Sequence, residues 1–473
     1  MAKKEYEVLV IGGGPSGYAA AFMAADLGMK TALIDPEENP GGVCLYRGCI
    51  PSKALLHIVK LKQEALEASE FGLSFSEPDI DVKKVREWKN SVVQKLVGGL
   101  GQLSSKRKVE HIRGMATFKD ANTVEVTYDG QSKEVSFKHA ILASGSEPVS
   151  LPDVEFSDNI MSSATALELK DIPKSLLVVG AGYIGLEIGS VYAGMGSKVT
   201  VVEMTDKLMP GADRDLVDVF AKRNKDLFED IMLETKVAEI SGKKKLKVKL
   251  EGKHEGEYKF DKVLIAIGRK PRTSNLGLEN TSVEVDDKGF VQINEQRQTA
   301  EKSIFAIGDI TGEPMLAHKA SHEGKIAAEA IAGETSAYEP KAIPAVVYTD
   351  PEIAWCGITE TEAKSRDIPI NVVKFPWAAS GRAATLGRSD GLTKLIFDPE
   401  TERILGVGIA GKNAGDMIPE AVLAVEMAAV AKDFSLTMHP HPTLSETLME
   451  AADVLYGQAT HIYRPKRDKK KNS

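Results

Sequence analysis

Residues 41–53 read Gly-Gly-Val-Cys-Leu-Tyr-Arg-Gly-Cys-Ile-Pro-Ser-Lys, and the rest of the chain is organised around this stretch. Its two cysteines, Cys44 and Cys49, precede a helix-forming run, so we expect a thiol pair at the start of a helix. At that position, unpaired backbone N–H groups and the positive end of the helix dipole stabilise a thiolate. The stretch therefore predicts a redox-active cysteine pair.

Two other interpretations compete for these cysteines. A structural zinc site needs about four ligands, and only His57 and the distant Cys356 remain to complete one. Free cysteines are also often buried for packing alone. We favour the redox pair because a dinucleotide fingerprint lies close upstream and because cofactors, rather than side chains, carry hydride chemistry. We expect no metal site.

A nucleotide-binding pattern precedes the cysteines. Residues 7–11 predict a short buried strand, after which Gly12, Gly14 and Gly17 fit the pattern G-x-G-x-x-G and open a helix. Such glycines permit a tight turn, a close approach of the pyrophosphate and close packing of helix on strand. The next strand ends at Asp35, where an acidic side chain would accept the ribose hydroxyls. Together these features predict a dinucleotide site.

The same nucleotide-binding pattern occurs a second time in the chain. Gly180, Gly182 and Gly185 follow another apolar strand, and Glu203 ends the next strand at the same interval as in the first copy. We interpret this as an internal duplication that binds two dinucleotides. The first copy leads into the cysteines and should hold the flavin, so the second should hold the nicotinamide cofactor. Glu203 would bond a free 2′-hydroxyl and repel a 2′-phosphate, which favours NAD over NADP.

A third cluster lies near the C-terminus. His439 and His441 are each followed by proline, which holds the preceding backbone extended and fixes where the rings point. Glu446 follows closely enough in the chain for its carboxylate to orient a ring nitrogen. Thiol–disulfide exchange needs a group that removes a proton from the incoming thiol, and imidazole suits this role.

The motif Gly-Gly-x-Cys-x4-Cys-Ile-Pro-Ser-Lys resembles the active site of the flavoprotein disulfide reductases, the class I pyridine nucleotide-disulfide oxidoreductases. Its Cys-Ile-Pro-Ser-Lys ending is most similar to that of the dihydrolipoamide dehydrogenases, and the resemblance extends along almost the whole chain. Val43 and the pair Tyr46-Arg47 depart from the Thr and the Asn-Val that are usual in the family. As a hypothesis, the charge of Arg47 between the cysteines favours thiolate over thiol.

The resemblance implies a role for each member of the catalytic set. Cys49 would lie nearest the flavin, and Cys44 would exchange with the substrate. His441 and Glu446 match the family's His-Pro-Thr-x-x-Glu, so His441 would be the base. It would reach the cysteines of the partner subunit, which makes a homodimer obligatory for activity. His439 is expected to be structural.

The resemblance also implies further positions that contact the two cofactors, FAD and NAD. On the FAD side, besides the first glycine loop, they are Gly114, Ala143, Ser144, Gly145, Asp309, Met315, Leu316 and Ala317. On the NAD side, besides the second loop, the resemblance implies Gly268, Arg269 and Glu187, the last paired with Lys53. For Glu187 the alternative is an ordinary carboxylate on a helix surface.

With 473 residues the chain has room for about three domains. We expect an α/β protein with two Rossmann-like dinucleotide-binding domains, one for FAD and one for NAD, and a C-terminal α+β dimerisation domain. The predicted boundaries are residues 1–150 and 279–345 for the FAD-binding domain, 151–278 for the NAD-binding domain and 346–473 for the interface domain.

Composition narrows the class of function. A net charge of −8 argues against nucleic-acid binding, and the sequence has no apolar run of the roughly 18 residues that a membrane span needs. Three cysteines are too few for a disulfide scaffold, and in a reducing compartment a paired cysteine is catalytic rather than structural. Strand-like residues begin at Tyr6 and leave no room for a secretory signal or a transit peptide, so we expect a cytoplasmic protein. The basic end, residues 464–471, is expected to be a solvated tail rather than a docking element for an acidic partner.

These features predict a flavoenzyme that oxidises protein-bound dihydrolipoamide to lipoamide through its cysteine pair and reduces NAD to NADH. Its partner would be a lipoyl-bearing protein of a 2-oxo acid dehydrogenase complex or of glycine cleavage. One alternative is another disulfide reductase, although glutathione-type enzymes usually carry Val-Pro-Lys-Lys after the second cysteine and prefer NADP. Another is a non-catalytic flavoprotein, which the intact catalytic set makes a weaker interpretation.

Overall fold

The computed structural model describes residues 5–463, which form two compact units. The first unit comprises the residues up to Lys174 together with Ile240–Lys247 and Lys259–Glu339. The second comprises Ser175–Glu239, Val248–Tyr258 and the residues from Pro340 onward. The basic tail, residues 464–471, lies outside the described residues. The domain boundaries inferred from the sequence stay a prediction.

A seven-stranded sheet forms the centre of the first unit, in the order β3-β2-β1-β6-β5-β4 with β17 also beside β6. Its strands are β1 (Glu5–Ile11), β2 (Thr31–Asp35), β3 (Glu110–Arg113), β4 (Met115–Asp120), β5 (Thr123–Tyr128), β6 (Gln131–Leu142) and β17 (Ile304–Ala306). Val10 of β1 pairs in parallel with Leu33 and Ile141. Parallel strands are buried on both faces, which explains why these segments are continuous apolar runs.

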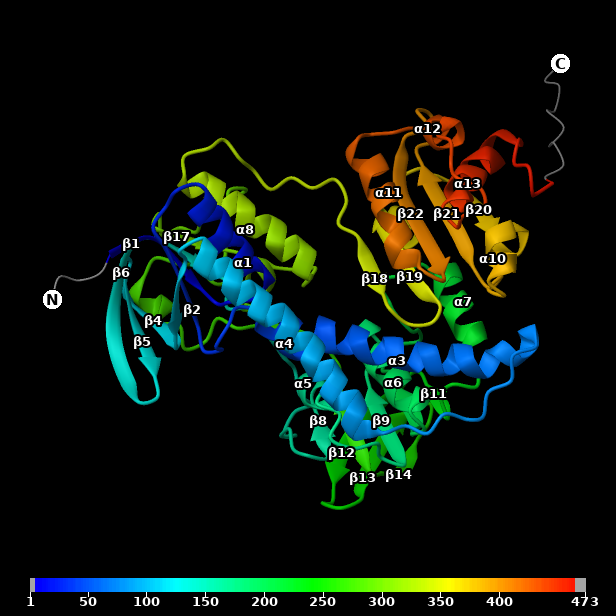
Figure 1. Ribbon diagram of the computed structural model, residues 1–473, viewed down its shortest axis with the longest axis horizontal. Helices are drawn as coiled ribbons and strands as arrows, with labels where there is room; N and C mark the ends of the chain where they lie inside the picture. The colour runs from blue at the N-terminus through cyan, green and yellow to red at the C-terminus, as the bar shows by residue number, and fades with distance from the viewer. Residues whose placement is uncertain (1–4, 464–473) are drawn as a thin grey trace. The chain divides into compact units, whose positions relative to one another are not determined.

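The two faces of this sheet pack against different layers. Along β1, Leu9 and Ile11 belong to a core that includes the side chains of β4 and β5. Val8 and Val10 belong to another core, which includes alanines of two helices. These helices, α1 (Pro15–Asp26) and α8 (Ala317–Ile331), lie side by side (Figure 1). The helix that opens at the first glycine loop is thus anchored on the sheet.

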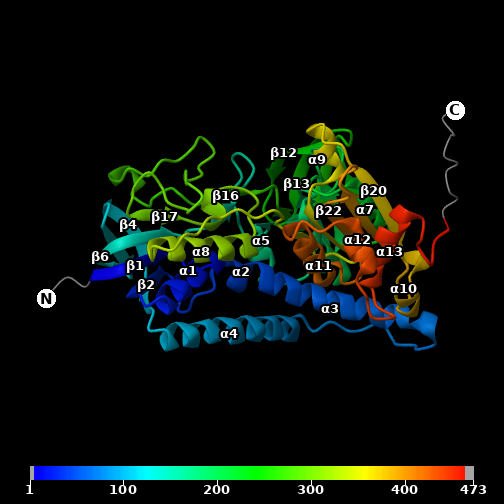
Figure 2. The same cartoon turned by 90° about the horizontal axis from the view of Figure 1, so that it is seen from above.

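The other helices of the first unit carry the cysteine stretch or follow it. They are α2 (Gly42–Arg47), α3 (Cys49–Glu67), α4 (Val82–Lys106) and α5 (Ser163–Ala166), with short turns η1 (Ala68–Phe71), η2 (Leu278–Asn280) and η3 (Gly308–Thr311). Helix α4 packs beside α3 (Figure 2). Two strand pairs complete the unit, β7 (Ser146–Pro148) with β16 (Arg269–Pro271) and β8 (Ile160–Met161) with β15 (Lys262–Ile265).

The second glycine pattern lies on parallel strands of the second unit. These are β9 (Ser175–Val179), β10 (Lys198–Val202) and β11 (Asp230–Met232), and Val201 pairs with both Val178 and Ile231. The helices that follow β9 and β10 are α6 (Tyr183–Gly194) and α7 (Arg214–Arg223). A three-stranded sheet comes next in the chain, made of β12 (Thr235–Ser241), β13 (Leu246–Gly252) and β14 (Gly256–Phe260).

The C-terminal part of the second unit is an antiparallel sheet in the order β18-β19-β22-β21-β20, accompanied by helices. Its elements are β18 (Ala345–Val347), β19 (Glu352–Gly357), α9 (Glu360–Ser365), β20 (Asn371–Pro376), η4 (Trp377–Ala379), α10 (Gly381–Thr385), β21 (Leu392–Phe397), β22 (Ile404–Gly411), α11 (Ala414–Glu426), α12 (Ala431–Leu436) and α13 (Glu446–Tyr456). Trp377 is fully buried in this core, and its ring N–H donates to Thr393 Oγ1 at 2.9 Å.

The α/β class, the Rossmann-like strand order of the nucleotide-binding parts and the α+β C-terminal part are confirmed. Within residues 5–463, no helix has the length and apolar character needed to cross a membrane.

Candidate active site

The two candidate redox cysteines lie on different helices. Cys44 is in the first turn of the short helix α2, and Cys49 is the first residue of α3. Gly48 separates the helices, and a Cβ at this position would lie 2.9 Å from the carbonyl oxygen of Val43. A larger residue would therefore disturb the turn between the two thiols. The cysteines thus stand in the first turns of two helices rather than at the start of one.

The two side chains are free thiols that hydrogen-bond to each other. The bond to Cys49 raises the pKa of Cys44, and burial raises it further, whereas the charge of Lys53 acts in the opposite direction. A pair that shares a proton in this way can release one proton more easily than two.

The two histidines of the C-terminal cluster have different surroundings. His441 Nδ1 lies 2.9 Å from Glu446 Oε1, and its side chain is 73% exposed. His439 is held through both ring nitrogens, by the Thr437 carbonyl oxygen at 2.9 Å and by Glu420 Oε1 at 2.7 Å, and its side chain is 4% exposed. Only His441 thus offers a ring nitrogen to a substrate, while His439 holds the segment in place.

Glu446 is positioned by the start of a helix. It is the first residue of α13, and its Oε2 accepts the Thr443 N–H at 2.7 Å while its Oε1 holds His441. This carboxylate is fixed at both oxygens, so it can keep the imidazole in one orientation and stabilise its protonated form. The structure therefore brings the expected base and its orienting acid together.

The first glycine loop connects β1 to α1. A Cβ at Gly12 would lie 2.2 Å from the carbonyl oxygen of Ala143, and a Cβ at Gly17 would lie 1.8 Å from that of Gly12. At Gly14, in contrast, no heavy atom of the described residues lies within 4 Å of such a Cβ. Gly14 precedes α1, and among the described residues no side chain caps that helix start. Its N–H groups are therefore available to a phosphate.

Asp35 closes this first site at the end of β2. The carboxylate is 7% exposed, and its Oδ2 accepts the Gly13 N–H at 2.6 Å. Burial raises the pKa of Asp35, whereas the Gly13 hydrogen bond and the charges of Arg47 and Arg272 lower it. The acid expected to meet the ribose is therefore fixed beside the glycine loop.

The other positions expected on the FAD side all lie in the first unit. The Gly114 N–H donates to the Asp35 carbonyl oxygen at 3.2 Å, and the Ala143 N–H donates to that of Ile11 at 2.8 Å, so both positions adjoin the ends of β1 and β2. The remaining ones are Ser144 and Gly145 after β6, Asp309 in η3, and Met315, Leu316 and Ala317 at the start of α8.

The second loop repeats the geometry of the first. A Cβ at Gly185 would lie 2.1 Å from the carbonyl oxygen of Gly180, and α6 begins after Gly182 without a side-chain cap among the described residues. Glu203 Oε2 accepts the Ala181 N–H at 2.8 Å. The second acid is thus held by the second loop in the way that the first acid is held by the first.

Glu187 is buried rather than exposed on its helix. It is 3% exposed, and its Oε1 accepts the Tyr348 N–H at 3.0 Å within the second unit. The alternative of an ordinary surface carboxylate is therefore wrong. Lys53 lies half-buried on α3 in the first unit, and its pairing with Glu187 stays a prediction.

Comparison with known proteins identifies the family. Residues 6–324 match the model of the pyridine nucleotide-disulphide oxidoreductases, and residues 343–452 match the dimerisation domain of the same proteins. The chain belongs to the pyridine nucleotide-disulphide oxidoreductase family. Its cofactors are accordingly FAD and NAD, and the matched dimerisation domain supports assembly as a homodimer.

Individual members of the family resemble the chain over nearly its whole length. It is 48% identical to the dihydrolipoyl dehydrogenase of Vibrio parahaemolyticus, with 98% of each chain covered, and 44% identical to that of Geobacillus stearothermophilus, with 97% and 98% covered. Among solved structures, LpdA from Mycobacterium tuberculosis matches with a TM-score of 0.88 at 25% identity, over 95% of this chain and 99% of that one. The HOCl-induced flavoprotein disulfide reductase RclA from Escherichia coli, in its Cu(II) complex, matches with a TM-score of 0.86 at 27% identity, over 96% and 100%.

The first unit fits the flavin dinucleotide that the family carries. The bare helix start after Gly14 offers N–H groups for the pyrophosphate, and the open space at Gly14 lets it approach. The buried Asp35 offers a carboxylate for the ribose hydroxyls. The geometry of this loop therefore fits the flavin that the family carries.

A partly buried polar network near Asp309 was missed at the level of sequence. Asp309 Oδ2 accepts the Ser146 hydroxyl at 2.5 Å, and the same hydroxyl accepts Arg269 Nε at 2.7 Å. Gly308, the residue before Asp309, donates its N–H to the fully buried Glu323 at 2.7 Å. Arg269, expected at the NAD side, thus contacts the group around Asp309. In the sequence, Glu323 could have been found as a charged residue on the helix face that also carries Ala320 and Ala327.

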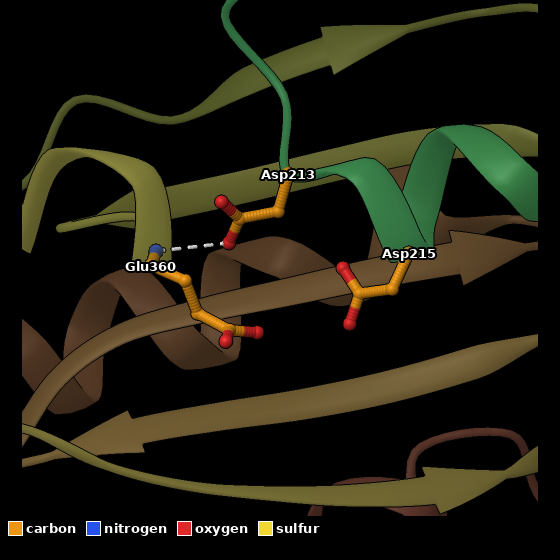
Figure 3. A group of neighbouring side chains, drawn as sticks. All are labelled: Asp213, Asp215 and Glu360. Carbon is orange, nitrogen blue, oxygen red and sulfur yellow. Dashed lines mark hydrogen bonds between the residues drawn. The ribbon is translucent and has the colours of Figure 1, made fainter. Parts of the chain in front are cut away.

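Three carboxylates of the second unit form a cluster with the appearance of a metal site. Oxygens of Asp213, Asp215 and Glu360 lie within 4.8 Å of one another, and the Glu360 N–H donates to Asp213 (Figure 3). Lys394 Nζ, however, donates to all three, at 2.6, 2.8 and 2.9 Å. Burial of Asp213 opposes ionisation, but the Lys394 hydrogen bond lowers its pKa below the usual value. An ammonium group therefore occupies the position that a metal ion would take.

Proposed function

We propose that the chain oxidises protein-bound dihydrolipoamide to lipoamide and reduces NAD to NADH. The observation that carries this proposal is the identity of 42–48% to relatives named dihydrolipoyl dehydrogenase, over nearly the full length of both chains. The hydrogen-bonded pair of Cys44 and Cys49 and the exposed His441 with its fixed Glu446 support it. The residues that thiol–disulfide exchange needs are all present.

The proposed exchange starts from the oxidised enzyme. His441 removes a proton from one substrate thiol, and the resulting thiolate attacks the sulfur of Cys44. The Cys44–Cys49 disulfide breaks, Cys49 leaves as a thiolate, and a mixed disulfide joins the substrate to Cys44. The second substrate thiol then attacks the substrate sulfur of this bond, which closes lipoamide and releases Cys44.

Protons and electrons balance over the cycle. Dihydrolipoamide loses two electrons and two protons, and NAD gains the two electrons and one proton, so that one proton is released to water. Bound FAD supplies the two-electron carrier between the dithiol and NAD. The hydrogen bond between the Cys44 and Cys49 thiols supports the proposal that the two sulfurs act as one redox pair.

The second loop supports NAD as the acceptor. The carboxylate of Glu203 would accept a hydrogen bond from a free 2′-hydroxyl and repel a 2′-phosphate. The roles of Gly268, Arg269 and the Glu187–Lys53 pair remain proposals of the same kind. We also propose that His441 serves the cysteines of the partner subunit, so that the active enzyme is the homodimer.

A dithiol assay tests this function. Purified protein is mixed with dihydrolipoamide and either NAD or NADP, and reduced nicotinamide is followed by absorbance. We expect NADH to form much faster than NADPH, and His441→Gln to slow the reaction by roughly 10²- to 10⁴-fold with its FAD retained. His439→Gln is the matched control for loss of packing. A flavoprotein that reduces another disulfide but ignores dihydrolipoamide would contradict the proposal.

The partner is proposed to be a lipoyl-bearing protein of a 2-oxo acid dehydrogenase complex or of glycine cleavage. The same assay with lipoyl domains from each system, at equal lipoyl concentration, separates the two. A cytoplasmic location is part of the proposal.

A further inference from the structure

Two residues of α2 that depart from the family pattern, Tyr46 and Arg47, reach back to the segment after β2. The Tyr46 hydroxyl donates to the carbonyl oxygen of Asn39 at 3.0 Å. The Arg47 guanidinium forms an ion pair with the Glu37 carboxylate. Consecutive side chains at the end of the helix that bears Cys44 therefore hold one short segment, residues 35–39, from two points.

This segment is the continuation of the nucleotide-binding acid. The Glu37 N–H donates to Asp35 Oδ1 at 2.9 Å, and the Glu37 carbonyl oxygen lies 2.9 Å from His111 Nε2. Asp35 in turn holds the glycine loop through Gly13. Residues 35–39 thus connect the glycine loop, β3 and α2. The positive charge of Arg47 also counteracts the rise in the pKa of Asp35 that burial causes.

The positive group that acts on the Cys44 thiol is Lys53. Among the described residues, Lys53 is the positive group that lowers the pKa of Cys44, and it lies one turn beyond Cys49 on α3. The guanidinium of Arg47 is committed to Glu37 instead. The hypothesis that Arg47 favours the thiolate stays untested, and the ion pair with Glu37 gives this side chain a second role.

We propose that Arg47 is a positioning residue for the flavin dinucleotide: together with Tyr46 it holds residues 35–39 so that the Asp35 carboxylate meets the ribose of the adenosine moiety. The ion pair of Arg47 and Glu37 carries no net charge and holds the segment that follows the buried Asp35. The proposal rests on the flavin that the family carries and not on the dithiol substrate. It places a determinant of cofactor retention within the redox motif itself.

The test measures FAD release from the holoenzyme, followed as the rise of flavin fluorescence in urea below the unfolding transition. Because exposed ion pairs contribute modestly, we expect Arg47→Val to release FAD about two- to fivefold faster than wild type. Glu37→Gln should accelerate release to the same extent, and the double variant should add little to either. Arg47→Lys keeps the charge and should lie between wild type and Arg47→Val.

A matched control exists in the same unit. Arg107 forms an ion pair with Asp26 at 3.0 Å, and these side chains are 31% and 53% exposed, against 47% and 32% for Arg47 and Glu37. Arg107→Val therefore removes a comparable pair that lies away from residues 35–39. It should leave FAD release unchanged. Equal acceleration in both variants would overturn the proposal, because the effect would then be a general loss of stability.

A second measurement addresses the thiols. The pH dependence of alkylation of the reduced enzyme by iodoacetamide should be the same in Arg47→Val and wild type. A shift of this profile to higher pH with unchanged FAD release would also overturn the proposal and return Arg47 to the cysteines. If Arg47→Val fails to fold, Glu37→Gln carries the same two measurements. Neither requires dihydrolipoamide, so a failure here is distinct from a failure of the proposed dithiol activity.

Discussion

The two dinucleotide loops share one geometry but fix their acids differently. In both, a backbone N–H inside the glycine loop donates to the carboxylate at the end of the next strand, Gly13 to Asp35 and Ala181 to Glu203. Asp35 is buried and tied to neighbours from β3 and α2, directly or through Glu37. Glu203 is half-buried, and its second oxygen accepts the N–H and the hydroxyl of the nearby Thr205.

This difference matches the behaviour expected of the two cofactors. An acid that is desolvated and braced by several elements keeps a dinucleotide in place, because release requires all of those elements to move. An acid fixed by its own chain neighbours leaves the ribose side accessible, which suits a dinucleotide that must bind and leave in every turnover. One loop geometry can therefore serve a resident and an exchanging cofactor, depending on what supports the acid.

The largest effect is expected from adding a methyl group at a glycine that lies against backbone in each loop. A methyl group at Gly17 would meet the carbonyl oxygen of Gly12, and one at Gly185 would meet that of Gly180. We expect Gly17→Ala and Gly185→Ala each to lower the free energy of unfolding by about 3 kcal/mol, because backbone must shift in a packed region. Flavin content and NAD titration then separate them, since Gly17→Ala should lose FAD and Gly185→Ala should lose only NAD affinity.

Gly98 provides the control for these variants. It lies within α4, and no heavy atom of the described residues lies within 4 Å of a Cβ built there. Gly98→Ala should raise the free energy of unfolding by roughly 0.5–1 kcal/mol, since alanine is the better helix former. Loss of both cofactors in either loop variant would contradict the assignment of one loop to each cofactor.

A smaller effect is expected from the acid of the second loop. Glu203→Gln removes the charge that a ribose hydroxyl would bond, so the KM for NAD should rise about tenfold, as expected for the loss of one hydrogen bond to a charged group. The FAD content should not change. Glu234→Gln alters an exposed carboxylate of the same unit that pairs with Lys253, and steady-state kinetics should show no difference for it. An unchanged KM in Glu203→Gln would remove this residue from the NAD site.

Asp35, the acid of the first loop, should make the stability of the apoprotein depend on pH. Burial raises the pKa of Asp35 above its ordinary 3.8, so the folded apoprotein holds this proton more strongly than the unfolded chain. The contribution of Asp35 to stability therefore falls as the pH rises from about 3.8 through the raised pKa. Asp35→Asn should remove this loss, so that the apoprotein becomes more stable above that range while its affinity for FAD falls.

Thermal unfolding of the two apoproteins over a pH series checks this expectation. Asp287→Asn, which alters an exposed aspartate of the same unit, should follow wild type. A loss of stability in Asp35→Asn at neutral pH would mean that the hydrogen bonds of this carboxylate outweigh its desolvation. The first acid would then serve the fold as much as the cofactor.

Local sequence patterns predicted most of the candidate site. Strand, glycines, helix and acid follow one another within a few residues, so their geometry is largely determined by neighbours in the chain. The same holds for His441 and Glu446, which lie five residues apart and are joined by a direct hydrogen bond. In such cases the backbone leaves few arrangements open, and residue types alone indicate the outcome.

Contacts between distant segments were not predictable in this way. Arg47 lies next to the cysteines in sequence, yet its charge is bound by Glu37, because the direction of a long side chain depends on the packing of α2. Glu323 accepts a hydrogen bond from the Gly308 N–H. Its burial depends on how α8 packs in the folded protein. The break at Gly48, which places the thiols on two helices, likewise lies at a position where a Cβ would crowd the Val43 carbonyl oxygen.

The buried ammonium of Lys394 has a consequence for how the C-terminal sheet responds to its surroundings. Its three carboxylates come from α7, from α9 and from the residue that precedes α7, while the lysine itself is part of β21. Since this cation is covalently part of the chain, a chelator cannot extract it and metal starvation cannot deplete it. The junction that it holds is therefore assembled as soon as the chain folds, whatever ions the cell provides.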